Sequence, residues 1–203
     1  MKFDVYDVAI ELIEPMLGTI PKDPEVYARY IASKAPSPDV GQDEVDADTV
    51  KKLELSGWTG FHEDENGLFL YNYAILGFMK EAGNILKDQL GVRNLRSKID
   101  MFVYVEPRRV RIPGQVVGVL ERPLRAMTAQ GPRVALARSD YVEAGTQLHF
   151  QLKILKNKEV TPEIIRRVLE FGTLKGLGQF RNGSYGRFKV VSFEEVKEAK
   201  EAS

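Results

Sequence analysis

The sequence predicts an α+β protein whose core follows the order βαββαβ, the ferredoxin-like arrangement. Three observations support this fold class. An alternating apolar stretch opens the chain, a helical repeat begins at Asn72, and a strand–helix–strand series occupies residues 145–193. Residues 17–67 show neither the alternation of a strand nor the spacing of a helix over any great length. We therefore expect a long insertion at residues 17–67, within one domain that spans residues 1–203.

In the first third of the chain, residues 3–14 predict a strand that ends near Pro15. Within the insertion, Pro24–Ile31 has a proline where a helix accepts one, at its first position. Residues 68–71 predict a short strand.

The middle of the chain begins with helical spacing. Apolar or small residues recur three and four positions apart, and Gly91 is placed to end the helix; they are Leu76, Met79, Gly83, Leu86 and Leu90. Strict alternation then predicts a strand that ends at Pro107, with Ile99, Met101, Val103 and Val105 on one side.

Beyond Pro107 the elements are short until residue 145. Residues 109–112 predict a strand that turns at Pro113-Gly114, and residues 119–138, with their two prolines, read as a loop that joins strands. Residues 145–154 predict a strand with Leu148, Phe150, Leu152 and Ile154 on its apolar side. Thr161-Pro162 is a capped helix start, residues 187–193 predict the last strand, and residues 194–203 form a charged helical tail or a frayed end.

Composition narrows the class of protein. Of the 203 residues, 43% are hydrophobic and 29% charged, which suits a water-soluble domain with a sizeable core. The absence of cysteine excludes disulfides and thiolate metal sites. The acidic start lacks the apolar run of a signal peptide, and no stretch approaches a membrane span, so we expect a cytoplasmic protein without a membrane partner.

The formal net charge is zero, but the charges are unevenly placed. Residues 39–48 hold five acids and no base, whereas residues 106–138 hold seven arginines and two glutamates. Such asymmetry can create an anion-binding face on a protein of ordinary pI. The alternative is that the arginines form dispersed surface ion pairs.

The run from Gly172 to Phe188 carries five glycines between the last predicted helix and the last strand. Glycine allows main-chain amides to approach an anion, and interleaved cations and aromatic rings can hold phosphates and bases. The alternative is that these glycines serve turns only. The candidate binding residues of this loop are Lys175, Gly176, Gly178, Arg181, Gly183, Tyr185, Gly186 and Arg187.

A second candidate segment is the arginine-rich stretch 119–138. Arginine, threonine and glutamine donors suit phosphate oxygens, and two prolines stiffen the segment. Its candidate binding residues are Arg122, Arg125, Arg133 and Arg138.

Catalytic and metal signatures are weak. His62 precedes three acidic residues, but adjacent loop positions point in different directions and no second histidine lies at ligand spacing, so we expect neither metal nor cofactor. His149 falls on the polar side of a predicted strand. Trp58 and Phe61 are expected to anchor the insertion to the core.

The last 60 residues resemble the RAMP superfamily, the repeat-associated CRISPR proteins built on RRM-like ferredoxin folds. Ala144–Leu152 matches the family's A-G-T-x-F-x-F-x-I strand, and Pro162–Phe171 matches its helix. Gly176, Gly178, Gly183, Gly186 and Arg187 match its G-x-G-x-x-x-x-x-G-x-G-R loop. Tyr73–Lys80 loosely resembles the helix start of the backbone subunits. The chain also resembles uncharacterised small proteins of tailed phages.

The resemblance implies a binder of single-stranded nucleic acid that works as a homo-oligomer along the strand. Subclasses of the family cleave RNA, but neither of their catalytic signatures is present, so we expect a non-catalytic protein, in the host cytoplasm if phage-encoded. DNA and RNA both remain open as partners. Two alternatives also remain: a metal-independent ribonuclease that uses His62 or His149, and a protein-interaction module or mimic of a RAMP subunit.

Overall fold

The computed structural model describes residues 1–23, 57–128 and 131–196, with side chains at all of these except 124–128 and 131–135. The predicted helix over Pro24–Ile31 and the acidic run lie outside the described residues. The chain forms two compact units. The first comprises residues 1–16, 62–115 and 142–203, and the second comprises residues 17–61 and 116–141.

The first unit is built on a four-stranded sheet with the order β12-β1-β11-β7. Its strands are β1 (Phe3–Leu12), β7 (Val103–Glu106), β11 (Gln147–Leu155) and β12 (Phe188–Glu195). Every neighbouring pair is antiparallel, so β1 runs parallel to β7, and β11 runs parallel to β12. Two split βαβ units result, and the predicted ferredoxin-like fold is confirmed.

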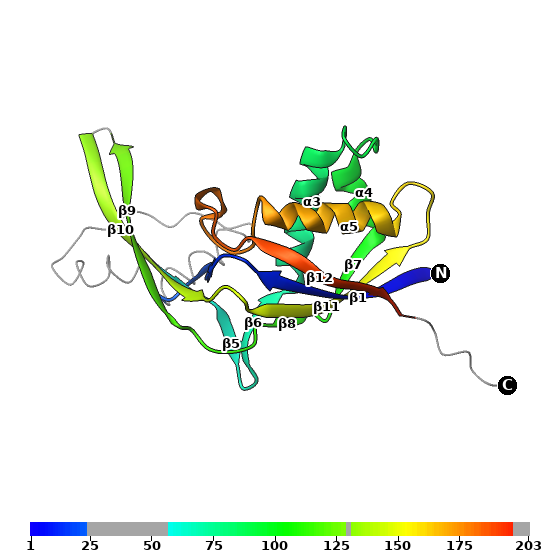
Figure 1. Ribbon diagram of the computed structural model, residues 1–203. Coiled ribbons are helices and arrows are strands. Elements are labelled where there is room, and N and C mark those ends of the chain that lie inside the picture. The colour runs from blue at the N-terminus through cyan, green and yellow to red at the C-terminus, as the bar shows by residue number, and fades with distance from the viewer. Residues whose placement is uncertain (24–56, 129–130, 197–203) are drawn as a thin grey trace, which may run out of the picture. The chain divides into compact units, whose positions relative to one another are not determined.

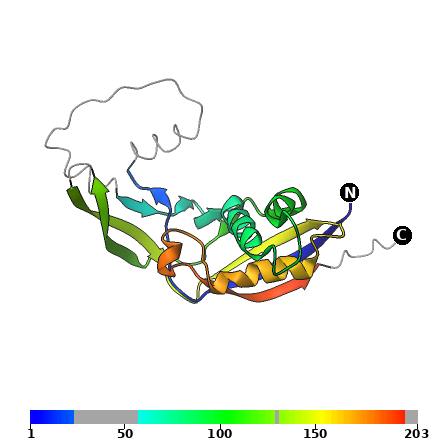
Figure 2. The same cartoon turned by 90° about the horizontal axis from the view of Figure 1, so that it is seen from above.

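Three helices lie on one side of this sheet, as Figure 1 shows. They are α3 (Asn72–Leu86), α4 (Leu95–Phe102) and α5 (Pro162–Glu170). Seen from above in Figure 2, α5 runs beside β12, while α3 and α4 lie together as a pair. Among the described residues, every helix falls short of the length and apolar character that crossing a bilayer requires.

The core between this sheet and its helices follows the predicted alternation. Leu148, Leu152 and Ile154 of β11 are buried, and Ile165 of α5 is buried as well. The Thr161 hydroxyl accepts a hydrogen bond from the Ile164 amide, so the predicted helix cap is confirmed. Burial of such aliphatic side chains contributes about 2 kcal/mol each to stability.

The boundary between α4 and β7 differs from the sequence prediction. The strand expected from Ile99 to Val105 is wrong in its first half, because residues 95–102 form a helix. Leu95 and Ile99 are buried at a spacing of four, whereas Met101 is 54% exposed. Packing of the α3–α4 pair outweighs the local period-two pattern.

A small second sheet in the same unit has the order β5-β6-β8. It consists of β5 (His62–Asp64), β6 (Gly67–Tyr71) and β8 (Arg109–Arg111). The last two confirm the short strands expected at residues 68–71 and 109–112. Leu68, Leu70 and Val110 are buried on one side of this sheet.

The second unit is another sheet, in which β10 (Gly131–Val142) pairs along its length with β9 (Gly118–Thr128). The loop expected at residues 119–138 is therefore wrong. The same sheet follows the order β2-β10-β4-β3 and takes in Met16–Leu17, Trp58–Gly60 and Ile20–Pro21. Two segments of the predicted insertion, Ile20–Pro21 and Trp58–Gly60, thus share a sheet with the hairpin.

A buried carboxylate fastens these segments together. Asp140 is 2% exposed and accepts a hydrogen bond from Trp58 Nε1 at 2.7 Å. Lys22 pairs with its other oxygen at 2.6 Å. Because a buried charge is costly without partners, these contacts fix the insertion against β10.

Candidate functional site

The glycines of the loop between α5 and β12 allow close packing. A Cβ on Gly172 would lie 2.4 Å from the ring of Phe188, and a Cβ on Gly176 would lie 2.1 Å from the carbonyl carbon of Gly186. All three glycines are buried. Main-chain segments can approach this closely only where no side chain intervenes.

Several amides of the loop bond within the chain. The Leu177 amide donates to the Gly186 carbonyl at 2.9 Å, and the Gly186 amide donates to Pro15 at 2.8 Å. The Gly183 amide donates to the Phe180 carbonyl. The sequence predicted that the amides of this loop would be available to an anion. The amides of Leu177, Gly183 and Gly186 are not available, because each already donates to a carbonyl of the chain.

The cations of the loop are paired with carboxylates. Lys175 and Arg181 contact the two oxygens of Glu81 on α3, at 2.5 and 2.7 Å. Burial disfavours ionisation of Glu81, but the hydrogen bonds from both cations outweigh it and hold its pKa below the ordinary value. Arg187 pairs with Glu14 at 2.8 Å. Two cations on one carboxylate leave the Glu81 cluster with a net charge of +1.

The tip of the loop presents aromatic side chains. The rings of Phe180 and Tyr185 lie 5.7 Å apart, and Phe180 is 44% exposed. Phe180 and Ser184 both adopt positive φ, as does Gly178. The tip therefore holds an exposed ring beside the cations of the Glu81 cluster.

The predicted arginine segment belongs to the second unit. Arg122 donates from Nη2 to the Ser139 hydroxyl at 2.9 Å, and Arg138 pairs with Glu121 at 2.8 Å. The side chains of Arg125 and Arg133 lie outside the described residues.

The outer side of the β5-β6-β8 sheet carries aromatic and arginine residues that the sequence-based site did not include. His62, Phe69 and Arg111 are cross-strand neighbours. The His62 ring stacks on Phe69 with centroids 5.3 Å apart, and Arg111 lies 5.4 Å from the Phe69 centroid. Arg109 lies 5.1 Å from the same centroid. We call this surface, comprising His62, Phe69, Tyr71, Tyr73, Arg108, Arg109 and Arg111, the aromatic–arginine face.

Asp64 holds two of these arginines in place. Arg111 binds its carboxylate through two nitrogens, at 2.6 and 3.0 Å, and Arg109 binds it at 2.7 Å. Hydrogen bonds from Arg111 hold the pKa of Asp64 well below its usual range. A bidentate pair fixes the plane of a guanidinium, so Arg111 is preorganised.

The aromatic–arginine face continues onto the start of α3. The rings of Tyr71 and Tyr73 stack at 5.4 Å, and the Arg108 guanidinium lies 5.6 Å from the Tyr71 centroid. Arg108 is exposed and makes no ion pair with any described residue. The sequence signal for this face was an alternation, Phe69-x-Tyr71 and Arg109-x-Arg111, which places each pair on one side of a strand.

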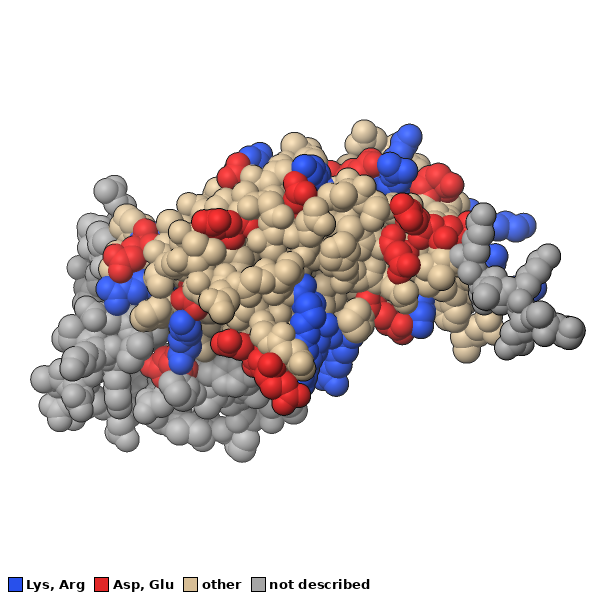
Figure 3. All heavy atoms as spheres, turned by 60° about the horizontal axis from the view of Figure 1, so that its bottom comes forward, with Lys and Arg blue, Asp and Glu red and all other residues tan. Residues whose placement is uncertain are grey.

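The opposite face of the four-stranded sheet has a different character. Its central strand β1 carries Asp7 and Glu11, which accept hydrogen bonds from Gln151 and Gln147 of β11. His149 is exposed there and pairs in register with Ala9. Figure 3 shows both signs of charge interspersed on the side of the molecule that it presents, with one group of basic side chains near the middle. Glu11 is also paired with Lys189 of β12 at 2.6 Å, so the acids and bases on this sheet face largely offset one another.

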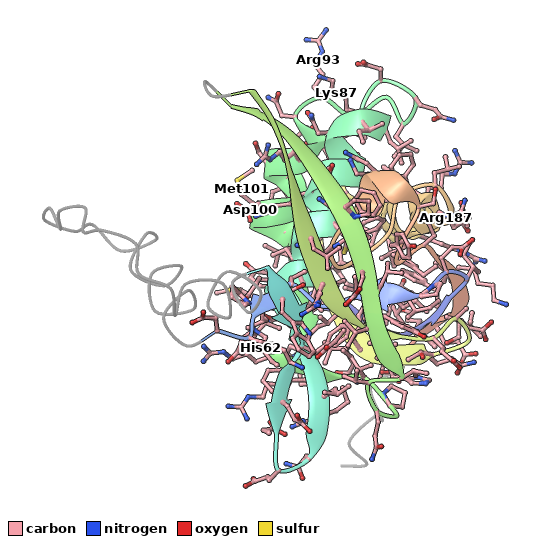
Figure 4. The ribbon with its side chains drawn as sticks, turned by 90° about the vertical axis from the view of Figure 1, so that its left-hand side faces the viewer. His62, Lys87, Arg93, Asp100, Met101 and Arg187 are labelled. Carbon is pink, nitrogen blue, oxygen red and sulfur yellow. The ribbon has the colours of Figure 1, made fainter. Side chains whose placement is uncertain are left out.

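His62 is partly buried against its aromatic neighbours. Its ring also meets Tyr71 edge-on at 4.7 Å, and its Nε2 is buried with no hydrogen-bond partner among the described residues. Burial lowers the pKa of His62 below 6.5. Figure 4 shows His62 well away from Lys87 and Arg93, which project together at one end of the α3–α4 pair. Within the described part of the chain, no group of three metal-ligating side chains is close enough to hold an ion.

The lowered pKa of His62 predicts a dependence of stability on pH. Below about pH 6.5 the unfolded chain protonates this histidine while the folded chain does not, so stability falls as the pH drops towards the folded pKa. Urea unfolding at about pH 5 and about pH 7 should show this loss, and His62→Phe should reduce it. The exposed His149→Gln variant is the control, and an unchanged loss in His62→Phe would contradict the assignment.

Comparisons with known proteins give structural likeness only. No family model matches the sequence, and no curated protein matches it. The structure is similar to a chain in the cryo-EM structure of the type III-B Cmr-β complex bound to cognate target RNA, with a TM-score of 0.53 and 13% identity. The match covers 98% of this chain but 62% of that chain. A type IV-B CRISPR complex gives a TM-score of 0.47 and 12% identity, covering 98% of this chain and 93% of that one. The first likeness supports the ferredoxin-like fold.

Proposed function

We propose that this protein is a non-catalytic binder of single-stranded nucleic acid. The observation that carries the proposal is the aromatic–arginine face, where the exposed Tyr73 and the partly exposed rings of His62 and Tyr71 lie among three arginines, with Phe69 buried beneath them. Bases stack on aromatic side chains and on guanidinium planes whatever their sequence, and arginine binds phosphate. Arg108, Arg109 and Arg111 against Asp64 give this face a net charge of +2.

The loop between α5 and β12 supplies a second contact in this proposal. Glu81 and Tyr73 both belong to α3, eight residues apart, which is about 12 Å along the helix. A strand running beside α3 would meet the rings at one end and the cations on Glu81 at the other. The hairpin arginines Arg122, Arg125, Arg133 and Arg138 remain predicted contacts.

The fold comparison supports the choice of partner. The Cmr-β chain of similar fold was solved in a complex with target RNA. By analogy we include in the proposal the assembly of several copies along one strand in the cytoplasm. Phage origin also belongs to the proposal, on the sequence resemblance alone.

A binding titration tests the function. Fluorescently labelled single- and double-stranded DNA and RNA of about 20 nucleotides are titrated at two salt concentrations. We expect single strands to bind, with affinity falling as salt rises, and the oligonucleotides to be recovered uncut. Arg108→Ala should weaken binding about tenfold and lower the salt slope by about 0.7, the value for one lost phosphate contact.

Arg93→Ala is the matched control, because Arg93 is an exposed arginine at the far end of α3. Its binding should equal that of wild type. Failure of every single strand to bind at low salt would overturn the proposal and favour the protein-interaction alternative. Loss of binding in Arg93→Ala but not in Arg108→Ala would move the interface to the α3–α4 turn.

A further inference from the structure

A cavity of about 610 Å³ opens beside the aromatic–arginine face, at the start of α3. It lies between that helix, the end of α4, the edge strand β7 and the turn after it. Figure 4 shows Asp100, one of its lining residues, on α4 beside Met101. The volume falls within the range of small-ligand sites.

Aromatic rings form part of its wall. Tyr73 is 62% exposed and Tyr104 is 46% exposed, and both line the cavity together with Pro107. Tyr71 stacks on Tyr73, and Phe3 meets Tyr104 edge-on at 6.0 Å. Each ring is therefore supported by a neighbour, which suits the wall to a flat aromatic ligand.

The polar groups left over in the cavity are mainly acceptors. Asn72 donates through Nδ2 to the Val105 carbonyl at 2.8 Å, and Gln151 donates through Nε2 to Asp7 at 2.8 Å. Their carbonyl oxygens accept no side-chain hydrogen bond from a described residue and are open to a ligand. Glu106 uses only Oε2 in its ion pair, so Oε1 remains as well. A ligand that carries N–H donors would satisfy these atoms.

The charge of the cavity favours an anionic ligand over a cationic one. Asp100 pairs with Lys80 at 2.9 Å, and Glu106 pairs with Lys153 at 2.6 Å. Arg108 lines the cavity without an ion pair among the described residues. Each lining carboxylate is thus offset by a lysine just outside the lining, and Arg108 brings the local balance to +1. An amine or guanidinium ligand would be repelled by this net positive charge, whereas a phosphate would be attracted by Arg108.

We infer that the cavity binds one nucleobase of the strand and prefers a base with an exocyclic amino group. Its phosphate lies at Arg108, its ring lies against Tyr73 or Tyr104, and its amino group donates to Glu106. Cytosine carries such an amino donor at the position where uracil carries an acceptor oxygen, which would face an acceptor here. This inference rests on the proposed function and adds a specificity to it.

The test compares oligo(dC) with oligo(dU) of equal length, because the two bases differ only along one edge: an amino group replaces an oxygen on C4, and the neighbouring ring nitrogen accepts in cytosine but carries a proton in uracil. We expect dC to bind about tenfold more tightly, as one well-placed base contact does elsewhere. Glu106→Gln should bring the ratio close to one, since the amide can turn a donor towards uracil. The exposed Glu143→Gln variant, outside the cavity, should keep the wild-type ratio.

Tyr73→Ala should weaken binding of both oligomers, because stacking does not distinguish them. Equal affinity of wild type for dC and dU overturns the inference and leaves the proposed function standing. If Glu106→Gln keeps the wild-type preference for dC over dU, the inference is overturned as well. Absence of binding to either oligomer overturns the proposed function itself.

Discussion

The Gly176→Ala variant is expected to lose about 3 kcal/mol or more of folding free energy. The added Cβ would lie 2.1 Å from a main-chain carbon and 2.3 Å from the carbonyl oxygen of Gly186. Main chain cannot rotate away as a flexible side chain can, so the loop must separate from its own continuation. Gly186→Ala should cost at least as much, since Gly186 also has φ +70° and its Cβ would meet the Leu177 carbonyl.

Gly77→Ala is the matched control for these two variants. Gly77 lies within α3, and a Cβ there meets nothing within 4 Å. Alanine should therefore stabilise the helix by about 0.5–1 kcal/mol. Urea unfolding followed by circular dichroism measures all three variants. If Gly176→Ala is as stable as wild type, the two main-chain segments do not approach each other this closely.

Inverting the Glu81 cluster is expected to weaken nucleic-acid binding about a hundredfold while the fold survives. In the triple variant Glu81→Lys, Lys175→Glu, Arg181→Glu, each ion pair is remade with its signs exchanged, so unfolding should change by no more than about 1 kcal/mol. The cluster charge changes from +1 to −1. Two lost phosphate contacts should also lower the salt slope by about 1.4.

The double variant Lys175→Glu, Arg181→Glu is the informative control, because it leaves three carboxylates together and should lower stability. Comparing the two variants separates the effect on folding from the effect on binding. If the triple variant binds as wild type does, the loop does not touch the strand. Its glycines would then serve turns and close packing, which agrees with the alternative that the sequence allowed, glycines that serve turns only.

The sequence predicted those core elements whose residue pattern is typical of only one kind of secondary structure. The alternation of β11 and the capped start of α5 follow from local chemistry, and the structure confirms both. The helix expected to run to Gly91 ends earlier, at Leu86, although Gly91 does adopt the positive φ of a turn. The β9–β10 hairpin was missed because Pro123 and Pro132 are typical of loops. Pro123 is compatible with a strand here because β9 pairs only with β10 among the described strands and so forms an edge.

The site was harder to predict than the fold. Glu81 and Arg181 are 100 positions apart in the sequence, and Lys175 is almost as distant from Glu81. Local spacing therefore could not predict either ion pair. The sequence predicted the loop cations but not the carboxylate that they share. The aromatic–arginine face combines residues 62–73 with 108–111, and only the pairing of β6 with β8 brings them together.

The position of β1 in the sheet sets an order of events during synthesis. Both of its neighbours come from the last third of the chain: Phe3 pairs with Leu155, and Tyr6 pairs with Glu195. While the ribosome is still translating, β1 has neither partner, and Val8 and Ile10 have no sheet to join. Closure of such distant contacts is slow, and the apolar side of β1 stays uncovered until both partner strands have been made.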